Sequence, residues 1–273
     1  MILRSWLISL TFLLTTSTFA YTPSDKHKLS SETPDQLVGV GITERLGEKL
    51  DLSVEVMSDE GVKMPLGDVF KGDLPVLFSV VYYNCPTLCN YHLNGLLEGF
   101  NDTDLTAGKD FKVVALSMNH REDSDLASLK KDSYLEEYGK KDVEAGWYFL
   151  TATEENIKKI TDQVGFAFKW DESQQEYSHA SAAITISPDG TISRYLHGVG
   201  FAGKTLQMAI LEAGKGKVGS IIDQIVLYCF QFNPSLNKYT LYAYNLMKIG
   251  GALTILILML ILGPVWFREL KKA

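Results

Sequence analysis

Short apolar segments alternate along the chain with longer segments in which apolar residues recur every three or four positions. The first kind is typical of buried strands and the second of helices. The pattern predicts strands at 75–83, 111–118, 147–151, 182–186 and 192–196, and helices at 90–100, 124–138, 154–164 and 204–213. Their order, β-α-β-α-β-α-β-β-α, is that of an α/β domain, and a short edge hairpin beginning at 52–57 is predicted ahead of it.

The strand at 75–83 is a nearly continuous run of apolar, β-branched and aromatic residues, so we expect it in the middle of the sheet. Cys85 and Cys89 lie between this strand and the helix at 90–100. A cysteine pair at that place in an α/β domain predicts a thioredoxin-like fold. The predicted domain covers 36–215.

Both ends of the chain carry apolar segments. Residues 1–20 contain Arg4, an apolar stretch and an ending at Ala20, which is the layout of a cleavable signal peptide. Near the other end, 249–267 contains no charged residue, and as a helix it would span roughly 28 Å, close to the hydrocarbon thickness of a bilayer. We therefore expect a C-terminal transmembrane helix at 247–267.

Charge around this helix predicts how the chain is oriented. The tail at 268–273 carries three basic residues, which the positive-inside rule assigns to the cytoplasm. The signal peptide and the tail together predict a single-pass protein of the inner membrane with its soluble domain in the periplasm. Within the exported part, we interpret 21–35 as a polar linker and 216–246 as a connector to the membrane.

Composition narrows the classes of partner. The chain has 273 residues and a formal net charge of −7, and its lysines and arginines do not cluster. A polyanion would be repelled by that charge, so we expect no nucleic-acid partner.

The cysteine pair suggests several kinds of chemistry. A helix beginning at Pro86 would put Cys85 and Cys89 on one helical face, with about 6 Å between their Cα atoms. The N-terminus of a helix favours thiolates, which both metal binding and thiol chemistry need. A structural disulfide would close only a tiny loop, and dithiol redox enzymes usually space their cysteines by two residues, so the spacing here favours a metal.

Two thiolates are soft donors that suit Cu(I) or zinc, and a histidine is the natural third ligand. His92 falls seven residues after Cys85 on the same helical face, but about 10 Å farther along the axis. His179 precedes a predicted strand, in a loop that we expect to face the cysteine helix. Spacing alone leaves a metal-binding and a strand-capping role for His179 equally open. Three histidines lie in the linker or near strand ends and are less suited: His27, His120 and His197.

With these residues in view, the chain resembles the Sco/SenC family over about 46–213. The resemblance is carried by three stretches: Val81-Tyr82-Tyr83-Asn84-Cys85-Pro86-Thr87-Leu88-Cys89, Leu93-Asn94-Gly95-Leu96, and His179 ahead of Ser187-Pro188-Asp189-Gly190. It implies a thioredoxin-like fold and copper, as Cu(I) or Cu(II), bound by Cys85, Cys89 and His179. It also implies a role in the assembly of cytochrome c oxidase.

The chain departs from the family pattern in two places. The family tends to have an Asp-Pro-x-x-Asp element after its second core strand, whereas this chain has Asn119-His120-Arg121-Glu122-Asp123. Asp123 is kept but the first aspartate is not, which puts in doubt any partner contact or loop geometry that the acidic pair supports. The predicted anchor is C-terminal, whereas an N-terminal anchor is common in the family.

Two functions remain open at this point. The first is a copper chaperone that delivers copper to the binuclear copper centre of cytochrome c oxidase; its partner would be the copper-bearing subunit or another periplasmic copper protein. The second is a thiol-disulfide oxidoreductase that keeps a partner's copper-binding cysteines reduced. A thioredoxin-like peroxidase is less suited, because the motif shows no lone activated cysteine.

Overall fold

The structure is a computed structural model that describes residues 38–214, 230–233, 238–241, 247, 248, 251, 253–255 and 258–260. Four predictions concern segments wholly outside these residues: the signal peptide at 1–20, the linker at 21–35, the tail at 268–273, and His27. The predicted transmembrane segment at 247–267 is described only in part. No helix among the described residues is long and apolar enough to cross a membrane.

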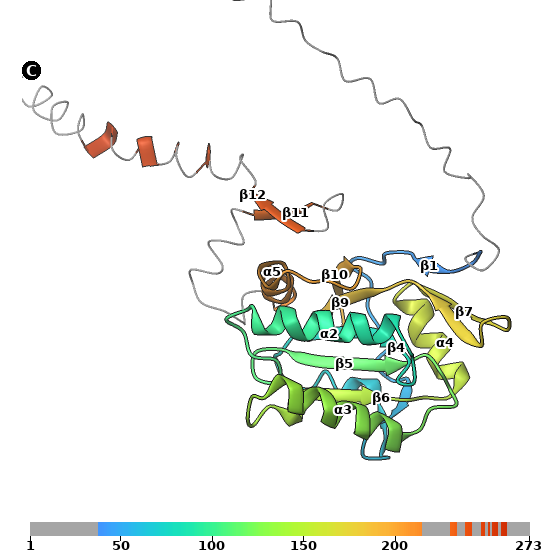
Figure 1. The fold of residues 1–273 in the computed structure, drawn as a ribbon. Helices are drawn as coiled ribbons and strands as arrows, with labels where there is room; N and C mark the ends of the chain where they lie inside the picture. The colour runs from blue at the N-terminus through green and yellow to red at the C-terminus, as the bar shows by residue number, and fades with distance from the viewer. Residues whose placement is uncertain are drawn as a thin grey trace, which may run out of the picture. The chain divides into compact units, whose positions relative to one another are not determined.

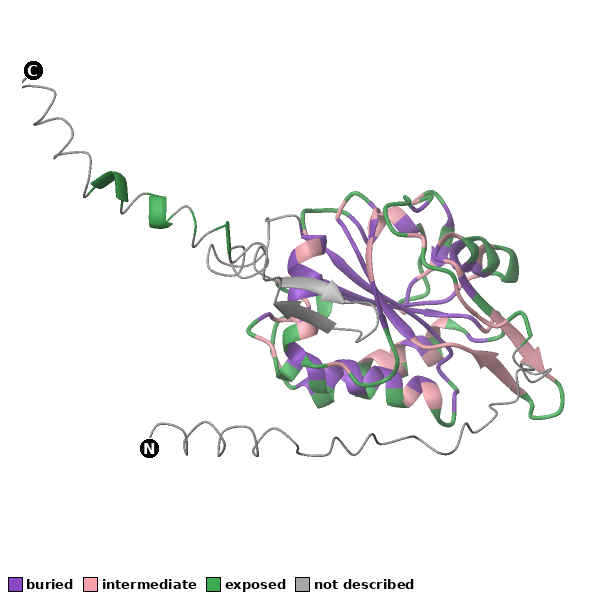
Figure 2. Cartoon of the chain, turned by 90° about the horizontal axis from the view of Figure 1, so that it is seen from above, coloured by how far each residue is buried: buried purple, intermediate pink, exposed green. Residues whose placement is uncertain are grey.

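A five-stranded sheet forms the centre of the domain (Figure 1). Its strand order is β10-β9-β4-β5-β6, in which β4, β5 and β6 are parallel and β9 pairs antiparallel with both β4 and β10. The bounds are β4 Val76–Val81, β5 Lys112–Ser117, β6 Trp147–Leu150, β9 Ala182–Ile186 and β10 Ile192–His197. All five predicted strands are present, and every residue of β4, β5 and β9 is buried (Figure 2).

Three helices lie side by side, with α2 contacting both α5 and α3 (Figure 1). These three helices are α2 Leu88–Asn101, α3 Ser124–Tyr138 and α5 Gly203–Ala213, and a further helix, α4 Glu154–Gln163, contacts β7. Asp123 caps α3 by accepting a hydrogen bond from the Leu126 N–H at 3.0 Å, and Gly139 ends that helix in the left-handed conformation (φ 67°). The α/β interpretation of the apolar pattern is therefore confirmed, with helix positions close to those predicted.

Glycines on α2 let the chain after β10 approach the helix closely. A Cβ atom on Gly95 would overlap the carbonyl oxygen of Val199, and one on Gly99 would lie 2.8 Å from the carbonyl oxygen of Phe201. The segment around 199–201 therefore runs directly over α2, which is the helix that carries Cys89.

A second, three-stranded sheet was not predicted. Its order is β1-β7-β8, with β1 Gly41–Ile42, β7 Phe166–Asp171 and β8 Glu176–His179. Most residues of β7 and β8 are only partly buried, so the period-two pattern of a half-buried strand is weak there. His179 ends β8, which corrects the expectation that it would lie in a loop: β8 pairs with β7, and Phe168 lies opposite His179.

Two hairpins complete the described structure. The edge hairpin predicted from 52–57 is present as β2 Glu55–Met57 and β3 Lys63–Pro65. The second, β11 Phe230–Asn233 with β12 Lys238–Leu241, falls in the segment that we interpret as a connector.

The close approach at Gly95 predicts a stability defect. Alanine favours a helix over glycine by about 1 kcal/mol, but overpacking typically costs about 1–3 kcal/mol. The overlapped atom is a backbone oxygen, so the cost lies at the upper end of this range, and we expect Gly95→Ala to lower the free energy of unfolding by about 2 kcal/mol, measured by urea denaturation. Gly200→Ala is the control, since a Cβ atom added there would have nothing within 4 Å; it should change the free energy by less than about 0.5 kcal/mol. Equal stability of both variants would contradict the packing described.

Candidate metal centre

The first cysteine lies in a turn between β4 and α2. The Cys85 N–H donates to the Tyr82 carbonyl at 3.3 Å, which closes the turn. Helix α2 begins at Leu88 rather than at Pro86, because Thr87 has the non-helical angles φ −137° and ψ −82°. Cys85 therefore precedes the helix while Cys89 lies in its first turn, which corrects the expectation that one helical face carries both.

The two cysteines are nevertheless in contact. The Cys89 N–H donates to Cys85 Sγ at 3.3 Å, and the Tyr82 N–H donates to Cys89 Sγ at 3.4 Å. Neither Cys85 nor Cys89 is in a disulfide, and both are buried. Because the N–H groups of the first helical turn have no partner within the helix, they stabilise negative charge on a sulfur placed there.

The pair is electrostatically asymmetric. A side-chain hydrogen bond from Cys89 is the largest of the interactions that lower the pKa of Cys85 to about 3; the Cys89 N–H and the Tyr82 hydroxyl also lower it. The same sulfur–sulfur hydrogen bond, together with burial, raises the pKa of Cys89. The hydrogen bond between the two sulfurs thus favours the thiolate at Cys85 and the thiol at Cys89.

His179 reaches this pair from the second sheet. Its Nε2 lies 3.4 Å from Cys89 Sγ, and its Nδ1 lies 2.7 Å from the Ala180 carbonyl oxygen. A carbonyl only accepts hydrogen bonds, so we assign the proton of the neutral ring to Nδ1, which leaves the lone pair of Nε2 toward the sulfur. Metal-binding histidines are commonly oriented by such a bond from the other ring nitrogen.

The separation of the donor atoms fits a shared ion. Thiolate and imidazole bind a metal such as zinc at about 2.3 Å and about 2.0 Å. A sulfur and a nitrogen 3.4 Å apart are therefore close enough that both could bind one ion. Within the described part of the chain, no group of three or more His, Cys, Asp or Glu side chains is arranged so that it could hold a metal ion. The structure places Cys89 in contact with both Cys85 and His179, and copper binding by the three residues stays a prediction.

His92 is held by contacts of its own. Its Nε2 lies 2.9 Å from Ser79 Oγ, and its Nδ1 lies 2.8 Å from Ser181 Oγ and 3.3 Å from the Gly198 carbonyl oxygen. Burial lowers the pKa of His92 to about 4, so the ring is neutral at neutral pH. These contacts agree with a structural role for His92. Elsewhere, His197 pairs with Glu44 at 2.8 Å, and His120 is exposed.

Sequence reasoning missed Glu122. Its Oε2 accepts hydrogen bonds from the Tyr83 N–H at 2.8 Å and the Ser117 hydroxyl at 2.6 Å, while its Oε1 accepts from the Asn84 N–H at 2.9 Å. The side chain is buried, and it holds the two residues immediately before Cys85. Its place between the two family aspartate positions was the only signal in the sequence.

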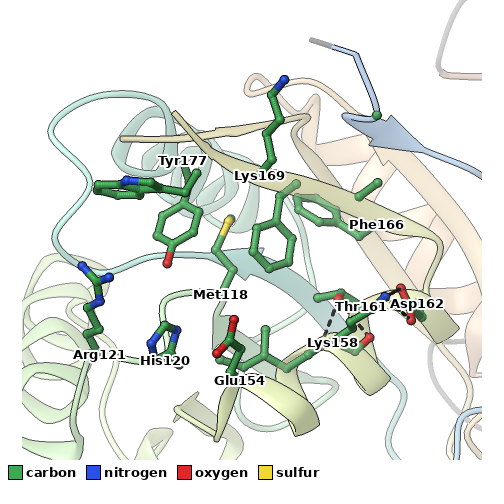
Figure 3. Close-up of a pocket in the computed structure, with 15 residues that line it drawn as sticks. Met118, His120, Arg121, Glu154, Lys158, Thr161, Asp162, Phe166, Lys169 and Tyr177 are labelled. Atoms are coloured by element: carbon green, nitrogen blue, oxygen red, sulfur yellow. Dashed lines mark hydrogen bonds and ion pairs between the residues drawn. The ribbon is translucent and has the colours of Figure 1, made fainter. Parts of the chain in front are cut away.

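Aromatic side chains connect the centre to a neighbouring cavity. Tyr82 makes edge-on contacts with both Tyr177 and His179, at 5.4 Å and 6.1 Å between ring centroids. Tyr177 also lines a cavity of about 530 Å³, together with Met118 and Arg121 (Figure 3). Neither the two cysteines nor His179 lines this cavity.

Solved structures with a similar fold include an Aquifex aeolicus protein proposed to act in electron transfer. It is 23% identical, with 62% of this chain and 94% of that chain covered and a TM-score of 0.52. Arabidopsis thaliana ScoI with copper bound is 15% identical (62% and 98% covered, TM-score 0.48), and BsSco, described as a member of the Sco family of cytochrome c oxidase assembly proteins, is 16% identical (63% and 97% covered, TM-score 0.48). No curated protein matched the chain.

The family model SCO1/SenC matches residues 57–210, which is more than half of the 273 residues. The matched range contains the cysteine turn, Glu122 and His179, and it extends from β2 into α5. This chain therefore belongs to the SCO1/SenC family.

Proposed function

We propose that this chain binds one copper ion through Cys85, Cys89 and His179 and delivers it to the binuclear copper centre of cytochrome c oxidase during assembly. The contact of 3.4 Å between Cys89 Sγ and His179 Nε2, next to the Cys85 thiolate, is the observation that carries this proposal. Membership in the SCO1/SenC family supports it.

The donor set suits copper as a transferable cargo. Two sulfurs and an imidazole are soft and intermediate donors that accommodate Cu(I), and the imidazole also suits Cu(II). Cys85 needs no proton loss before it binds, whereas Cys89 must release its proton to the solvent or to a base. A three-ligand site leaves room for a fourth ligand from a partner, so copper can pass by ligand exchange.

The asymmetric cysteine pair favours a second candidate function, that of a thiol-disulfide oxidoreductase. A low-pKa cysteine beside a protonated one is the arrangement in which one thiolate attacks a partner disulfide and the second thiol then resolves the mixed disulfide. Such an activity would keep the copper-binding cysteines of a partner reduced. It uses the same two sulfurs as copper binding, so a chain carrying copper would be inactive in exchange.

For the location, we propose a periplasmic domain held at the inner membrane by the segment 247–267. The proposal rests on the apolar length of that segment and on the basic tail after it. Attachment to the membrane would keep the domain near a membrane-embedded oxidase and raise its effective concentration there.

Copper stoichiometry tests the ligand set. The reduced full-length protein should bind one copper per chain, and Cys85→Ser or Cys89→Ser should abolish stoichiometric binding because a hydroxyl is a hard, poorly ionised donor. His179→Ala should retain Cu(I) more weakly and lose the Cu(II) form. Metal analysis after gel filtration gives the copper content per chain of the wild type and of each variant.

His92→Ala is the matched control, because His92 is a buried histidine bonded to serines rather than to sulfur. It should keep one copper per folded chain. If His92→Ala abolished binding while His179→Ala did not, the proposed ligand set would be wrong. Oxidation of the pair to a disulfide should also release the metal, since it uses both sulfurs.

The pH dependence of the thiolate signal tests the asymmetry of the pair. A lowered pKa means that Cys85 remains a thiolate from alkaline pH down to acidic pH and gains a proton only as the pH approaches about 3. The ultraviolet thiolate absorbance of the copper-free wild type minus that of Cys85→Ser should therefore persist at about pH 6, well below the ordinary thiol range. Cys89→Ala removes the largest stabilising hydrogen bond and should shift the midpoint upward. A wild-type midpoint near the ordinary thiol value of about 8.5 would contradict the assignment.

Reporter fusions test the orientation. A cytoplasm-specific reporter fused after Ala273 should be active, and a periplasm-specific one should be inactive, because the basic tail is expected to stay in the cytoplasm. Activity of a periplasm-specific reporter at that position would refute the proposed topology.

A further inference from the structure

We propose that Glu122 is the residue that positions Cys85, by fixing the turn before it in the conformation in which the two sulfurs can share one ion. The expected effect of Glu122 on copper affinity rests on the copper-binding function proposed above. Its effect on the conformation of the turn does not. No metal ligand is added: Glu122 acts through the backbone.

The hydrogen bonds of Glu122 converge on the cysteine turn. The two oxygens of one carboxylate accept from consecutive backbone N–H groups, those of Tyr83 at 2.8 Å and Asn84 at 2.9 Å. Two bonds from one rigid group to successive residues fix both the position and the direction of the backbone just before Cys85. The Ser117 hydroxyl at 2.6 Å holds the carboxylate itself against the end of β5.

Burial of Glu122 and of two of its partners means that water cannot easily take over these hydrogen bonds of the carboxylate. Glu122 is only 8% exposed, and its partners Tyr83 and Ser117 are 3% and 0% exposed. Water has little access to the N–H group of Tyr83, so this group would remain unpaired if the carboxylate were removed. Asn84 is exposed, so the carboxylate fixes the direction of its N–H group but does not shield it from water. A turn that has lost these bonds would relax toward other conformations, and Cys85 would move with it.

Neighbouring acidic residues do not share this role. Asp123 accepts from the Leu126 N–H and caps α3, and Asp125 is exposed in the first turn of the same helix. Asn119, at the first aspartate position of the family pattern, accepts from the Arg121 N–H at 3.1 Å through its Oδ1. In this chain the carboxylate that reaches the cysteine turn therefore comes from the position before the second aspartate of that pattern.

The test compares Glu122→Gln and Glu122→Ala with Asp125→Asn in the reduced full-length protein. Glu122→Gln keeps the shape and one acceptor oxygen, so it should fold even if Glu122→Ala does not. Asp125→Asn removes one negative charge from the same region without removing a described hydrogen bond. Cu(I) affinity is measured by competition with a chromophoric Cu(I) chelator, because changes in the residues that orient ligands typically weaken metal binding by about 10–100-fold.

A second readout does not involve metal. Amide hydrogen exchange at Asn84 and Cys85, and the equilibrium constant for reduction of the Cys85–Cys89 disulfide by dithiothreitol, are measured on the copper-free variants. We expect Glu122→Gln to weaken Cu(I) binding at least about 10-fold, to accelerate exchange at Asn84, and to change the reduction equilibrium, while Asp125→Asn changes none of these.

The outcomes separate the two proposals. If Glu122→Gln lowered the melting temperature but left Cu(I) affinity, exchange at Asn84 and the reduction equilibrium at wild-type values, Glu122 would be an ordinary stabilising residue and this inference would be overturned. If the wild type bound no copper, the proposed function would fail, and the exchange and reduction data alone would decide the role of Glu122. If Asp125→Asn changed Cu(I) affinity, exchange at Asn84 and the reduction equilibrium as much as Glu122→Gln does, the positioning role of Glu122 would also be overturned. Such a result would show a general effect of charge.

Discussion

The candidate centre depends on a contact between side chains that lie 90 residues apart, the one between Cys89 Sγ and His179 Nε2. Cys89 and His179 are positioned by different parts of the fold. The cysteines lie where the central strand β4 gives way to α2, and the histidine lies at the end of a hairpin in a different sheet. The contact therefore depends on the packing between the hairpin and the domain, and the aromatic contacts of Tyr82 and Phe166 with the imidazole contribute to that packing.

Hydrogen bonds that do not involve a ligand atom define much of this geometry. The Ala180 carbonyl orients the imidazole, Glu122 holds the turn before Cys85, and the Tyr83 hydroxyl lies 2.8 Å from the carbonyl oxygens of both Ala115 and Leu150. Ala180 follows β8, Glu122 lies between β5 and α3, and the Tyr83 side chain reaches from the turn after β4 to β5 and β6. The centre is thus supported by β4, β5, β6 and β8 together, although only the turn before α2, α2 itself and β8 supply the candidate ligands.

The apolar pattern was sufficient to predict the central sheet, because its strands are buried throughout and their composition leaves little choice. It failed for β7 and β8, where most residues are partly exposed and polar residues such as Lys169 and Ser178 interrupt the apolar ones. It also placed the start of α2 too early, since the preference of proline for a first helical turn does not reveal the backbone angles of Thr87. Glu122 looked like one more polar residue of a surface loop, and only the tertiary structure shows that it is buried.

The long separation between the ligands has a consequence for how copper and folding are coupled. An ion held by Cys89 and His179 would tie together the two ends of a 90-residue loop, much as a cross-link does. Closing a loop of that length removes chain entropy from the unfolded state worth on the order of 4 kcal/mol. A chain with such an ion bound would then resist unfolding and proteolysis more strongly than a metal-free chain, so quality control in the cell would preferentially retain the metal-bound form.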